Sequence, residues 1–221
     1  MSTHSHTPSP ADSDDHGDAQ DFWENHYAAR EQIWSGRVNA PLAGFAAALP
    51  PGRALDLGCG EGGDAAHLAG LGWQVTAVDI SSLALARTRA RVEAAGVADR
   101  VTTERHDLSR SFPAGSFGLI SAQYLQAPFE FSRPAIFRRA AAALTVGGVL
   151  FIVDHGAPPP WAKDHHAHHH FPGPREVYDG IGLDPAGYRA ERLASPEREA
   201  TGPDGVTGTL VDNVIAIRRL A

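Results

Sequence analysis

Between residues 53 and 154, short runs of apolar residues alternate with longer segments in which apolar residues recur every three or four positions. The short runs predict buried strands, and the longer segments predict helices that are buried along one face. Strands are expected at 53–57, 73–79, 100–105, 117–122 and 148–154, with helices at 62–71, 81–95 and 132–144. Strands that alternate with helices of this length are typical of a doubly wound parallel sheet.

The alternation changes after residue 154. A short helix is expected at about 174–181, and two strand-like runs follow at about 188–199 and 208–219. The Ala-Thr-Gly-Pro-Asp-Gly segment between these runs is typical of a turn, so the two strands should pair antiparallel. The predicted fold class is therefore α/β: a doubly wound, seven-stranded, mostly parallel sheet with a C-terminal antiparallel hairpin and helices on both faces.

The N-terminal residues differ in composition from the rest of the chain. Residues 1–20 are polar and rich in His, Ser, Pro and Asp, which is typical of a disordered acidic tail. Residues 21–221 are expected to form a single domain. Its expected parts are a helical lid (21–49), a cofactor-binding core (53–154), and a substrate loop followed by the hairpin (155–221).

Composition narrows the classes of partner. The net charge is −7 and the N-terminal tail is acidic, which argues against nucleic acid as the main partner. No segment approaches the roughly 20 consecutive apolar residues of a membrane helix, and the N-terminus lacks the pattern of a signal peptide. The single cysteine, Cys59, excludes an internal disulfide and suits a reducing compartment. We therefore expect a cytoplasmic protein without a membrane or nucleic-acid partner.

The strongest motif is Leu-Asp-Leu-Gly-Cys-Gly-Glu-Gly-Gly at 55–63, between the first predicted strand and the first predicted helix. Gly58, Gly60 and Gly63 have the G-x-G-x-x-G spacing. This spacing lets a nucleotide ligand approach bare backbone and the unpaired N–H groups of a helix start. Several nucleotide ligands use such loops, so the spacing alone leaves the ligand open.

Two acids make the loop more specific. Asp56, two residues before Gly58, would repel a dinucleotide pyrophosphate but suit a ligand that carries an ammonium and a sulfonium group. Asp79 ends the next strand, where an acid can accept hydrogen bonds from both ribose hydroxyls. The structural alternatives are a strand-end cap for Asp56 and a helix N-cap for Asp79.

With these motifs, about residues 20–154 resemble the class I S-adenosylmethionine-dependent methyltransferases, and the terminal hairpin is similar to that family's reversed seventh strand. The resemblance implies that the 58–60 loop packs against the methionine part of S-adenosylmethionine, that Asp79 holds the ribose and that Asp107 bonds the adenine amino group. It also implies that residues 122–126 lie beside the sulfonium and the acceptor. The cofactor-binding residues expected on this basis are Tyr27, Trp34, Asp56, Gly58, Cys59, Gly60, Asp79, Ile80, His106, Asp107, Leu108, Ala122 and Gln123.

Three shorter segments resemble one branch of that family. Phe-Trp-Glu-Asn-His-Tyr at 22–27, Ile-Trp-Ser-Gly at 33–36 and Ser-Ala-Gln-Tyr at 121–124 are similar to the small-molecule branch that includes thiopurine and tellurite-resistance methyltransferases. The aromatic residues before the core are interpreted as a lid that excludes water, or as the buried face of an amphipathic helix.

The acceptor is expected to contact Trp23, Gln126 and His155. His155 directly follows the fifth strand, at the edge of the sheet where ligands bind, and is the candidate general base. Its structural alternative is a hydrogen-bonded loop histidine.

Two other features carry reactive side chains. Cys59 is interpreted as a packing residue, because its place between two glycines turns backbone rather than thiol toward a ligand. The Lys-Asp-His-His-Ala-His-His-His run at 163–170 is interpreted as a flexible active-site loop, although zinc or nickel ligation stays open. A metal site needs three or four converging ligands with support around them, and a proline-rich loop seldom supplies that. No metal is therefore assigned.

The predicted function is methyl transfer from S-adenosylmethionine to a small, partly apolar molecule by in-line displacement, which leaves S-adenosylhomocysteine. Two alternatives stay open. One is a nicotinamide oxidoreductase, which the glycine spacing suggests but Asp56 and the hairpin disfavour. The other is a non-catalytic protein that binds the cofactor or a metal, since a fold alone does not establish chemistry.

Overall fold

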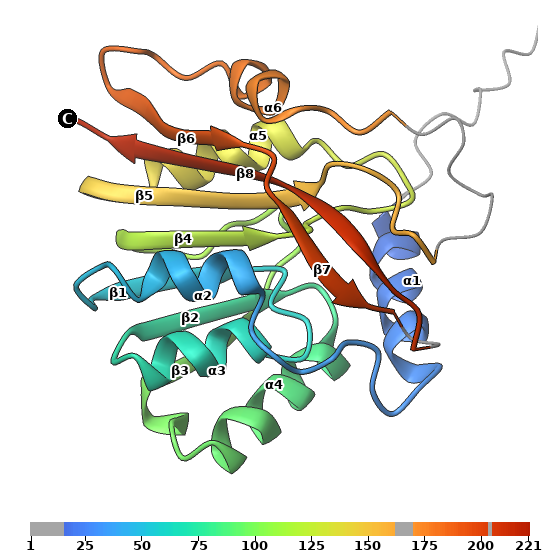
Figure 1. Ribbon diagram of the computed structural model, residues 1–221. Coiled ribbons are helices and arrows are strands. Elements are labelled where there is room, and N and C mark those ends of the chain that lie inside the picture. The colour runs from blue at the N-terminus through green and yellow to red at the C-terminus, as the bar shows by residue number, and fades with distance from the viewer. Residues whose placement is uncertain (1–15, 162–169, 203–204) are drawn as a thin grey trace, which may run out of the picture.

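The computed structural model describes residues 16–161, 170–202 and 205–221 (Figure 1). Their strands are β1 (Arg53–Leu57), β2 (Gln74–Asp79), β3 (Val101–Arg105), β4 (Phe117–Gln123), β5 (Leu144–His155), β6 (Tyr188–Ala194), β7 (Glu197–Thr201) and β8 (Thr207–Arg219). The sheet order is β3-β2-β1-β4-β5-β8-β6, and β7 pairs with β8 off this path. Strands β1 to β5 pair in parallel, whereas β8 is antiparallel to β5, β6 and β7. The predicted fold class is confirmed.

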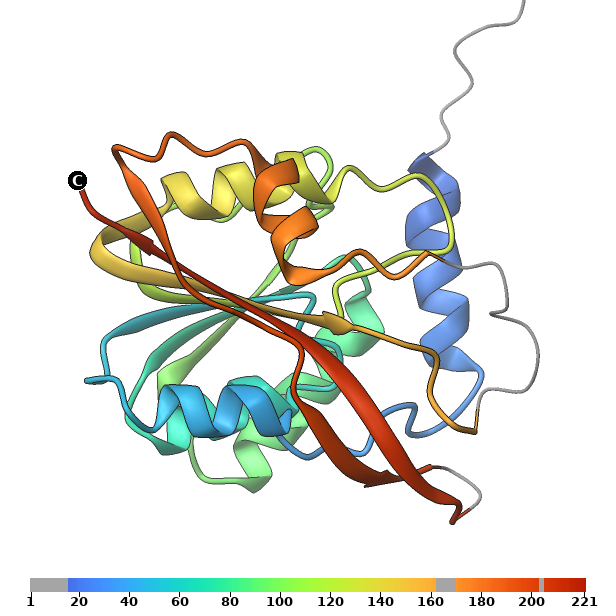
Figure 2. The same cartoon turned by 45° about the horizontal axis from the view of Figure 1, so that its top comes forward.

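Helices cover both faces of the sheet (Figure 2). They are α1 (His16–Ala28), α2 (Ala40–Ala46), α3 (Gly63–Gly70), α4 (Ser82–Ala94), the 3-10 turn η1 (Ala98–Arg100), α5 (Arg133–Ala142) and α6 (Pro174–Ile181). One apolar core joins α2, α3 and α4 to one face, where the rings of Phe45 and Phe151 stack 4.2 Å apart. The other core joins α5 and α6 to the opposite face. Alternating residues of β5 supply both cores, which explains its continuous apolar run.

Two boundaries differ from the expectation. Helix α1 already begins at His16, inside the range 1–20 that was assigned to the tail, and residues 1–15 lie outside the described part of the chain. The single run expected at 188–199 is divided into β6 and β7 at Ser195 and Pro196, because proline has no N–H for the ladder. Beyond this break, β7 and residues 207–211 of β8 form a two-stranded C-terminal ribbon that extends past the sheet.

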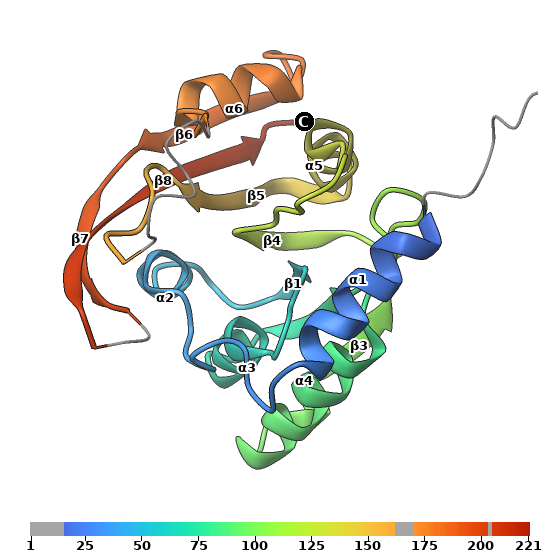
Figure 3. The same ribbon diagram turned by 90° about the vertical axis from the view of Figure 1, so that its right-hand side faces the viewer.

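Glu24 of α1 joins that helix to the start of α4. Its carboxylate accepts hydrogen bonds from the Ser81 hydroxyl at 2.8 Å, the Ser82 N–H at 2.6 Å and the Leu83 N–H at 3.2 Å. These groups open α4, so Glu24 satisfies donors that a helix start leaves unpaired. Figure 3 shows α1 crossing beside α4 at the end of the sheet. In the described part of the chain, no helix is long and apolar enough to cross a membrane.

Replacing Glu24 with alanine should lower the free energy of unfolding by about 1–2 kcal/mol, the usual cost of losing a helix cap. Urea unfolding followed by circular dichroism measures this change. The exposed Glu31, replaced in the same way, is the matched control and should change stability by less than about 0.5 kcal/mol. Equal stability of the two variants would contradict the capping role.

Candidate functional site

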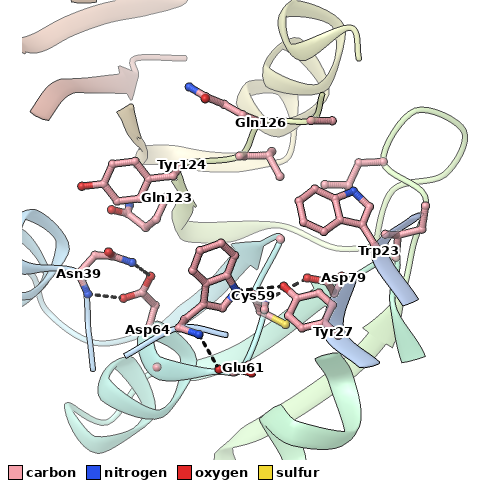
Figure 4. A pocket seen from close by; sticks show the side chains of 18 of the residues that line it. Trp23, Tyr27, Asn39, Cys59, Glu61, Asp64, Asp79, Gln123, Tyr124 and Gln126 are labelled. Atoms are coloured by element: carbon pink, nitrogen blue, oxygen red, sulfur yellow. Dashed lines mark hydrogen bonds between the residues drawn. The ribbon is translucent and has the colours of Figure 1, made fainter. Parts of the chain in front are cut away.

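A cavity of about 610 Å³ lies where the carboxyl ends of β1, β2, β4 and β5 meet α1 and the segment after it. Its volume is within the range of small-molecule sites, and carboxyl edges of parallel strands are where such sites form. The sequence-predicted residues that line it are Trp23, Tyr27, Trp34, Gly58, Cys59, Gly60, Asp79, Ile80, His106, Asp107, Leu108, Gln123, Gln126 and His155. Figure 4 shows several of their side chains converging on one space.

Two residues that were expected to bind the cofactor do not line this cavity. Ala122 is fully buried in the core on the α5 side of the sheet. Asp56 is only 2% exposed. The expected contact of these two side chains with the cofactor is therefore not supported, because successive strand residues point to opposite faces of the sheet and a residue next to the ligand edge can be buried beneath it.

The glycine loop forms the floor of the cavity with bare backbone. Gly58 and Gly60 have φ values of +68° and +55°, in the left-handed region that favours glycine. A Cβ atom at Gly58 would lie 2.7 Å from Leu125 Cδ1, and one at Gly60 would lie 3.1 Å from the Tyr27 hydroxyl. Side chains at these two positions would collide with Leu125 and Tyr27, so only glycine fits there and the loop presents its backbone to the cavity.

Cys59 does not behave as a nucleophile in this loop. It is 8% exposed, and its Sγ atom lies 3.6 Å from Thr88 Oγ1. Burial, with smaller effects from the neighbouring carboxylates, raises the pKa of the thiol well above its usual value. A protonated thiol is a poor nucleophile, so packing is its role here.

Asp79 joins the end of β2 to the glycine loop. One carboxylate oxygen accepts the Gly60 N–H at 3.0 Å, and the other accepts the Ser81 N–H at 3.0 Å. The side chain is 7% exposed and lines the cavity. Burial raises the pKa of Asp79 to about 6, although the hydrogen bonds to its carboxylate oppose this rise. Each oxygen keeps lone-pair capacity for a second donor.

The floor beside the loop holds more acceptors than donors. Asp64 accepts the backbone and side-chain N–H groups of Asn39, each at 2.7 Å (Figure 4). Gln123 Oε1, whose residue lines the cavity, and Oδ2 of Asp56, which does not line it, are buried and have no hydrogen-bond partner among the described residues. Burial, followed by neighbouring carboxylates, raises the pKa of Asp56 well above its usual value. This end of the cavity suits a ligand that brings N–H donors or positive charge.

Glu61 fastens the segment after α1 to the glycine loop. Its two oxygens accept the N–H groups of Ile33 at 3.0 Å and Trp34 at 3.1 Å, and Arg87 pairs with it at 2.7 Å. Trp34 in turn donates its indole N–H to the Tyr27 hydroxyl at 3.3 Å. These contacts hold Tyr27 and Trp34 in the lining of the cavity, and Figure 4 shows Tyr27 beside Cys59 and Asp79.

Several functional residues were missed from the sequence. Asp64 lies in the first turn of α3, where an acid is ordinary and gives no signal of its own, and Glu61 comes just before the Gly62 N-cap of that helix. Arg198 lines the cavity from a distant part of the chain, and no local pattern pointed to it. Tyr124 was not named individually, but it lies in the 122–126 segment that was expected beside the acceptor. In the structure it follows β4 and lines the cavity with a φ of +51°, which is unusual for a bulky residue.

The histidine run at 163–170 lies outside the described residues except for His170. Nε2 of His170 is 2.9 Å from Glu176 Oε1, and both side chains are exposed. Over the ranges that the structure describes, no group of three or more His, Cys, Asp or Glu residues is placed to hold a metal ion.

Residues 54–148 match the family described as methyltransferase domain. The chain is 32% identical over 136 residues to 27-O-demethylrifamycin SV methyltransferase of Amycolatopsis mediterranei, covering 60% of this chain and 49% of that protein. It is 34% identical over 125 residues to ribosomal RNA small subunit methyltransferase C of Chromohalobacter salexigens, covering 51% of this chain and 34% of that protein. The chain therefore spans half or less of the length of these two relatives.

The fold also matches solved structures. TehB from Haemophilus influenzae superposes with a TM-score of 0.60 at 17% identity, over 88% of this chain and 66% of that chain. At this identity the match concerns the fold alone. The family match and the relatives agree that residues 54–148 are a methyltransferase domain, and the sheet order with its reversed last strand is that of the Rossmann-like methyltransferase fold.

Proposed function

We propose that the chain binds S-adenosylmethionine in this cavity and transfers its methyl group to a small-molecule acceptor. The observation that carries the proposal is the acceptor-rich floor: bare glycine backbone beside Asp79 and the unpartnered Gln123 Oε1. A ligand with an ammonium and a sulfonium group matches this floor, whereas a pyrophosphate would meet carboxylates. The nicotinamide alternative is therefore disfavoured.

The parts of the cofactor fit successive segments of the cavity. The loop at Gly58 and Gly60 would hold the methionine part, and Gln123 Oε1 would accept an N–H of its ammonium group. Asp79 would accept the ribose hydroxyls. Asp107, whose Oδ1 already accepts the Ser109 N–H at 2.9 Å, would lie at the adenine end with its two chain neighbours.

The bound cofactor supplies an electrophilic methyl group on a sulfonium. The residues of this chain position the acceptor in line with that group and exclude water, and such positioning can supply on the order of 7–11 kcal/mol. Trp23, Tyr27 and Trp34 close the cavity on the α1 side. His155 would take the proton from an acceptor hydroxyl or amine, whereas an acceptor that is already ionised needs no base.

A small acceptor is supported by the shape and charge of the molecule. The net charge is −7, and the lining of the cavity includes the aromatic side chains of Phe129, Phe131 and Trp161. The negative net charge would repel a phosphate backbone, and the aromatic lining favours an apolar molecule or one that stacks on aromatic rings. Because one of the relatives is an RNA methyltransferase, RNA is the alternative acceptor against which the small-molecule proposal must be tested.

The acceptor class is tested with methyl-labelled S-adenosylmethionine and two substrate fractions, a panel of small aromatic hydroxyl compounds and amines, and purified ribosomal subunits. We expect label in the small-molecule fraction. The Asp79→Ala variant is the control for transfer that does not depend on the proposed site. Label only in ribosomal RNA would contradict the small-molecule proposal, and no transfer to either fraction would favour a non-catalytic binding protein.

The raised pKa of Asp79 predicts that cofactor affinity depends on pH. Protonation removes a carboxylate acceptor, so the affinity for S-adenosylhomocysteine should fall by up to about tenfold per pH unit below about pH 6 and level off above it. The free energy of unfolding depends on pH in the opposite direction. Because the pKa of Asp79 is higher in the folded protein than its usual value of 3.8, its contribution to stability is fully present below pH 3.8 and is lost as the pH rises through about 6. Calorimetric titration between about pH 5 and pH 8 measures the affinity. An Asp79→Asn variant with the same pH slope as the wild type would contradict the assignment.

A further inference from the structure

The C-terminal ribbon contributes to one wall of the cavity. Arg198 of β7 lines the cavity, and its side chain is 33% exposed. Residues Pro160 and Trp161, which follow β5, pack against this ribbon where glycines leave room: a Cβ at Gly202 would overlap the Trp161 ring, and one at Gly208 would lie 2.7 Å from Pro160. The ribbon thus brings a cation and an indole to the same wall.

One buried carboxylate holds this wall together. Asp212, 1% exposed, accepts the Tyr124 hydroxyl at 2.8 Å and the Arg198 Nε–H at 2.5 Å. Arg198 Nη2 also approaches the Tyr124 hydroxyl at 3.4 Å. Asp212 is the antiparallel partner of His155, and the ring of His155 stacks on that of Tyr124 with centroids 4.4 Å apart. The residue after β4 and residues of β5, β7 and β8 therefore meet at one place.

Tyr124 is held there in an unfavourable backbone conformation. Its φ of +51° is the one positive value among the described residues other than glycine. Such a conformation costs on the order of 1–3 kcal/mol and persists where the surroundings fix it, often at ligand sites. The Asp212 hydrogen bond and the bond from the Tyr124 N–H to the Val153 carbonyl, at 2.7 Å, fix it here.

The guanidinium of Arg198 keeps unused donors. Within the part of the chain that the structure describes, its Nη1 makes no hydrogen bond, while Nε and Nη2 are engaged with Asp212 and Tyr124. The fixed fork of an arginine matches the two oxygens of a carboxylate. Among the residues that line the cavity with it, Asp64 and Asp79 are already engaged by Asn39, Gly60 and Ser81, so they do not take up this donor.

We propose that Arg198, set in place by Asp212 and Tyr124, binds an anionic group of the methyl acceptor, and that the acceptor is a small aromatic or apolar carboxylate. The inference rests on the proposed function, since it names the acceptor class of that same cavity. Arg198 is thus a specificity-determining residue, and Asp212 is a positioning residue. The apolar body of the acceptor would lie against Trp161 and Phe131, with its carboxylate toward the ribbon.

The test uses calorimetry on the full chain saturated with S-adenosylhomocysteine. Matched pairs serve as probes: 4-hydroxybenzoate and 4-hydroxybenzamide, salicylate and salicylamide, and indole-3-acetate and indole-3-acetamide. At least one carboxylate should bind roughly ten- to hundredfold more tightly than its amide, the size expected for hydrogen bonds to a charged group. The Arg198→Gln variant should lose this preference and keep its affinity for S-adenosylhomocysteine.

Two further variants make the result decisive. The double variant Arg198→Gln with Asp212→Asn removes both charges, so it leaves no buried unpaired carboxylate that could unfold the ribbon. Arg218→Gln is the matched control, because Arg218 pairs with Glu191 at 2.5 Å outside the cavity and should keep the preference.

The proposal is overturned if no carboxylate is preferred to its amide, or if the preference survives in both Arg198 variants. Arg198 would then only neutralise Asp212. The titration of the wild-type protein with S-adenosylhomocysteine, which precedes the acceptor titrations, separates this failure from failure of the proposed function. If the wild-type protein does not bind S-adenosylhomocysteine, the cofactor assignment is contradicted instead.

Discussion

Replacing Asp79 with alanine should weaken the binding of S-adenosylhomocysteine by roughly 100-fold or more, because a hydrogen bond to a charged group contributes about 1.5–3 kcal/mol and the ribose offers two. The variant also leaves the N–H groups of Gly60 and Ser81 without their acceptor, so the loop under the cofactor loosens. Calorimetric titration of the wild type and the variant at the same pH measures the loss.

The control for this experiment is Asp99→Ala, an exposed acid on η1 outside the cavity, which should leave the affinity unchanged. Circular dichroism and thermal unfolding establish that the Asp79 variant is folded. A folded Asp79→Ala protein with wild-type affinity would show that the cofactor, if it binds, does so elsewhere.

The second large effect concerns Glu61. Its replacement by alanine should lower the free energy of unfolding by about 2–4 kcal/mol, because Arg87 and two backbone N–H groups lose a nearly buried partner. Affinity for S-adenosylhomocysteine should fall as well, since Trp34 is no longer held over the floor. Urea unfolding gives the first quantity and calorimetry the second.

Glu61→Gln is the matched variant, because it keeps the shape of the side chain and one acceptor oxygen. It should be intermediate in both measurements. If Glu61→Ala were within about 0.5 kcal/mol of the wild type, the carboxylate would not fasten the lid, and the contacts of Arg87 with the chain would have to do so alone.

The order of the elements was predictable because each has a simple local cause. The strand expected at 53–57 has the same bounds as β1, and the glycines after it are needed for the positive φ values of the loop. The acid at the end of β2 followed from the same topology, since carboxyl ends of parallel strands share one edge. Most of the residues expected at the site line one cavity for that reason.

The remaining contacts depend on residues far apart in the chain. Tyr124 and Asp212 are 88 positions apart, and Ile33 and Glu61 are 28 apart. The first pair depends on the register of β5 against β8, and the second depends on how the segment after α1 packs on the glycine loop. No local sequence pattern encodes either arrangement. The break between β6 and β7 is different, because Pro196 inside the run is a local signal for it: proline has no N–H for the ladder.

The most direct test of the account is a calorimetric titration of the wild-type protein with S-adenosylmethionine, S-adenosylhomocysteine and NADH in parallel. The account predicts micromolar binding of the first two, with one site per chain, and no measurable binding of NADH. Preference for NADH, or no binding of either sulfur ligand, would contradict the assignment of the glycine loop and its carboxylates to S-adenosylmethionine.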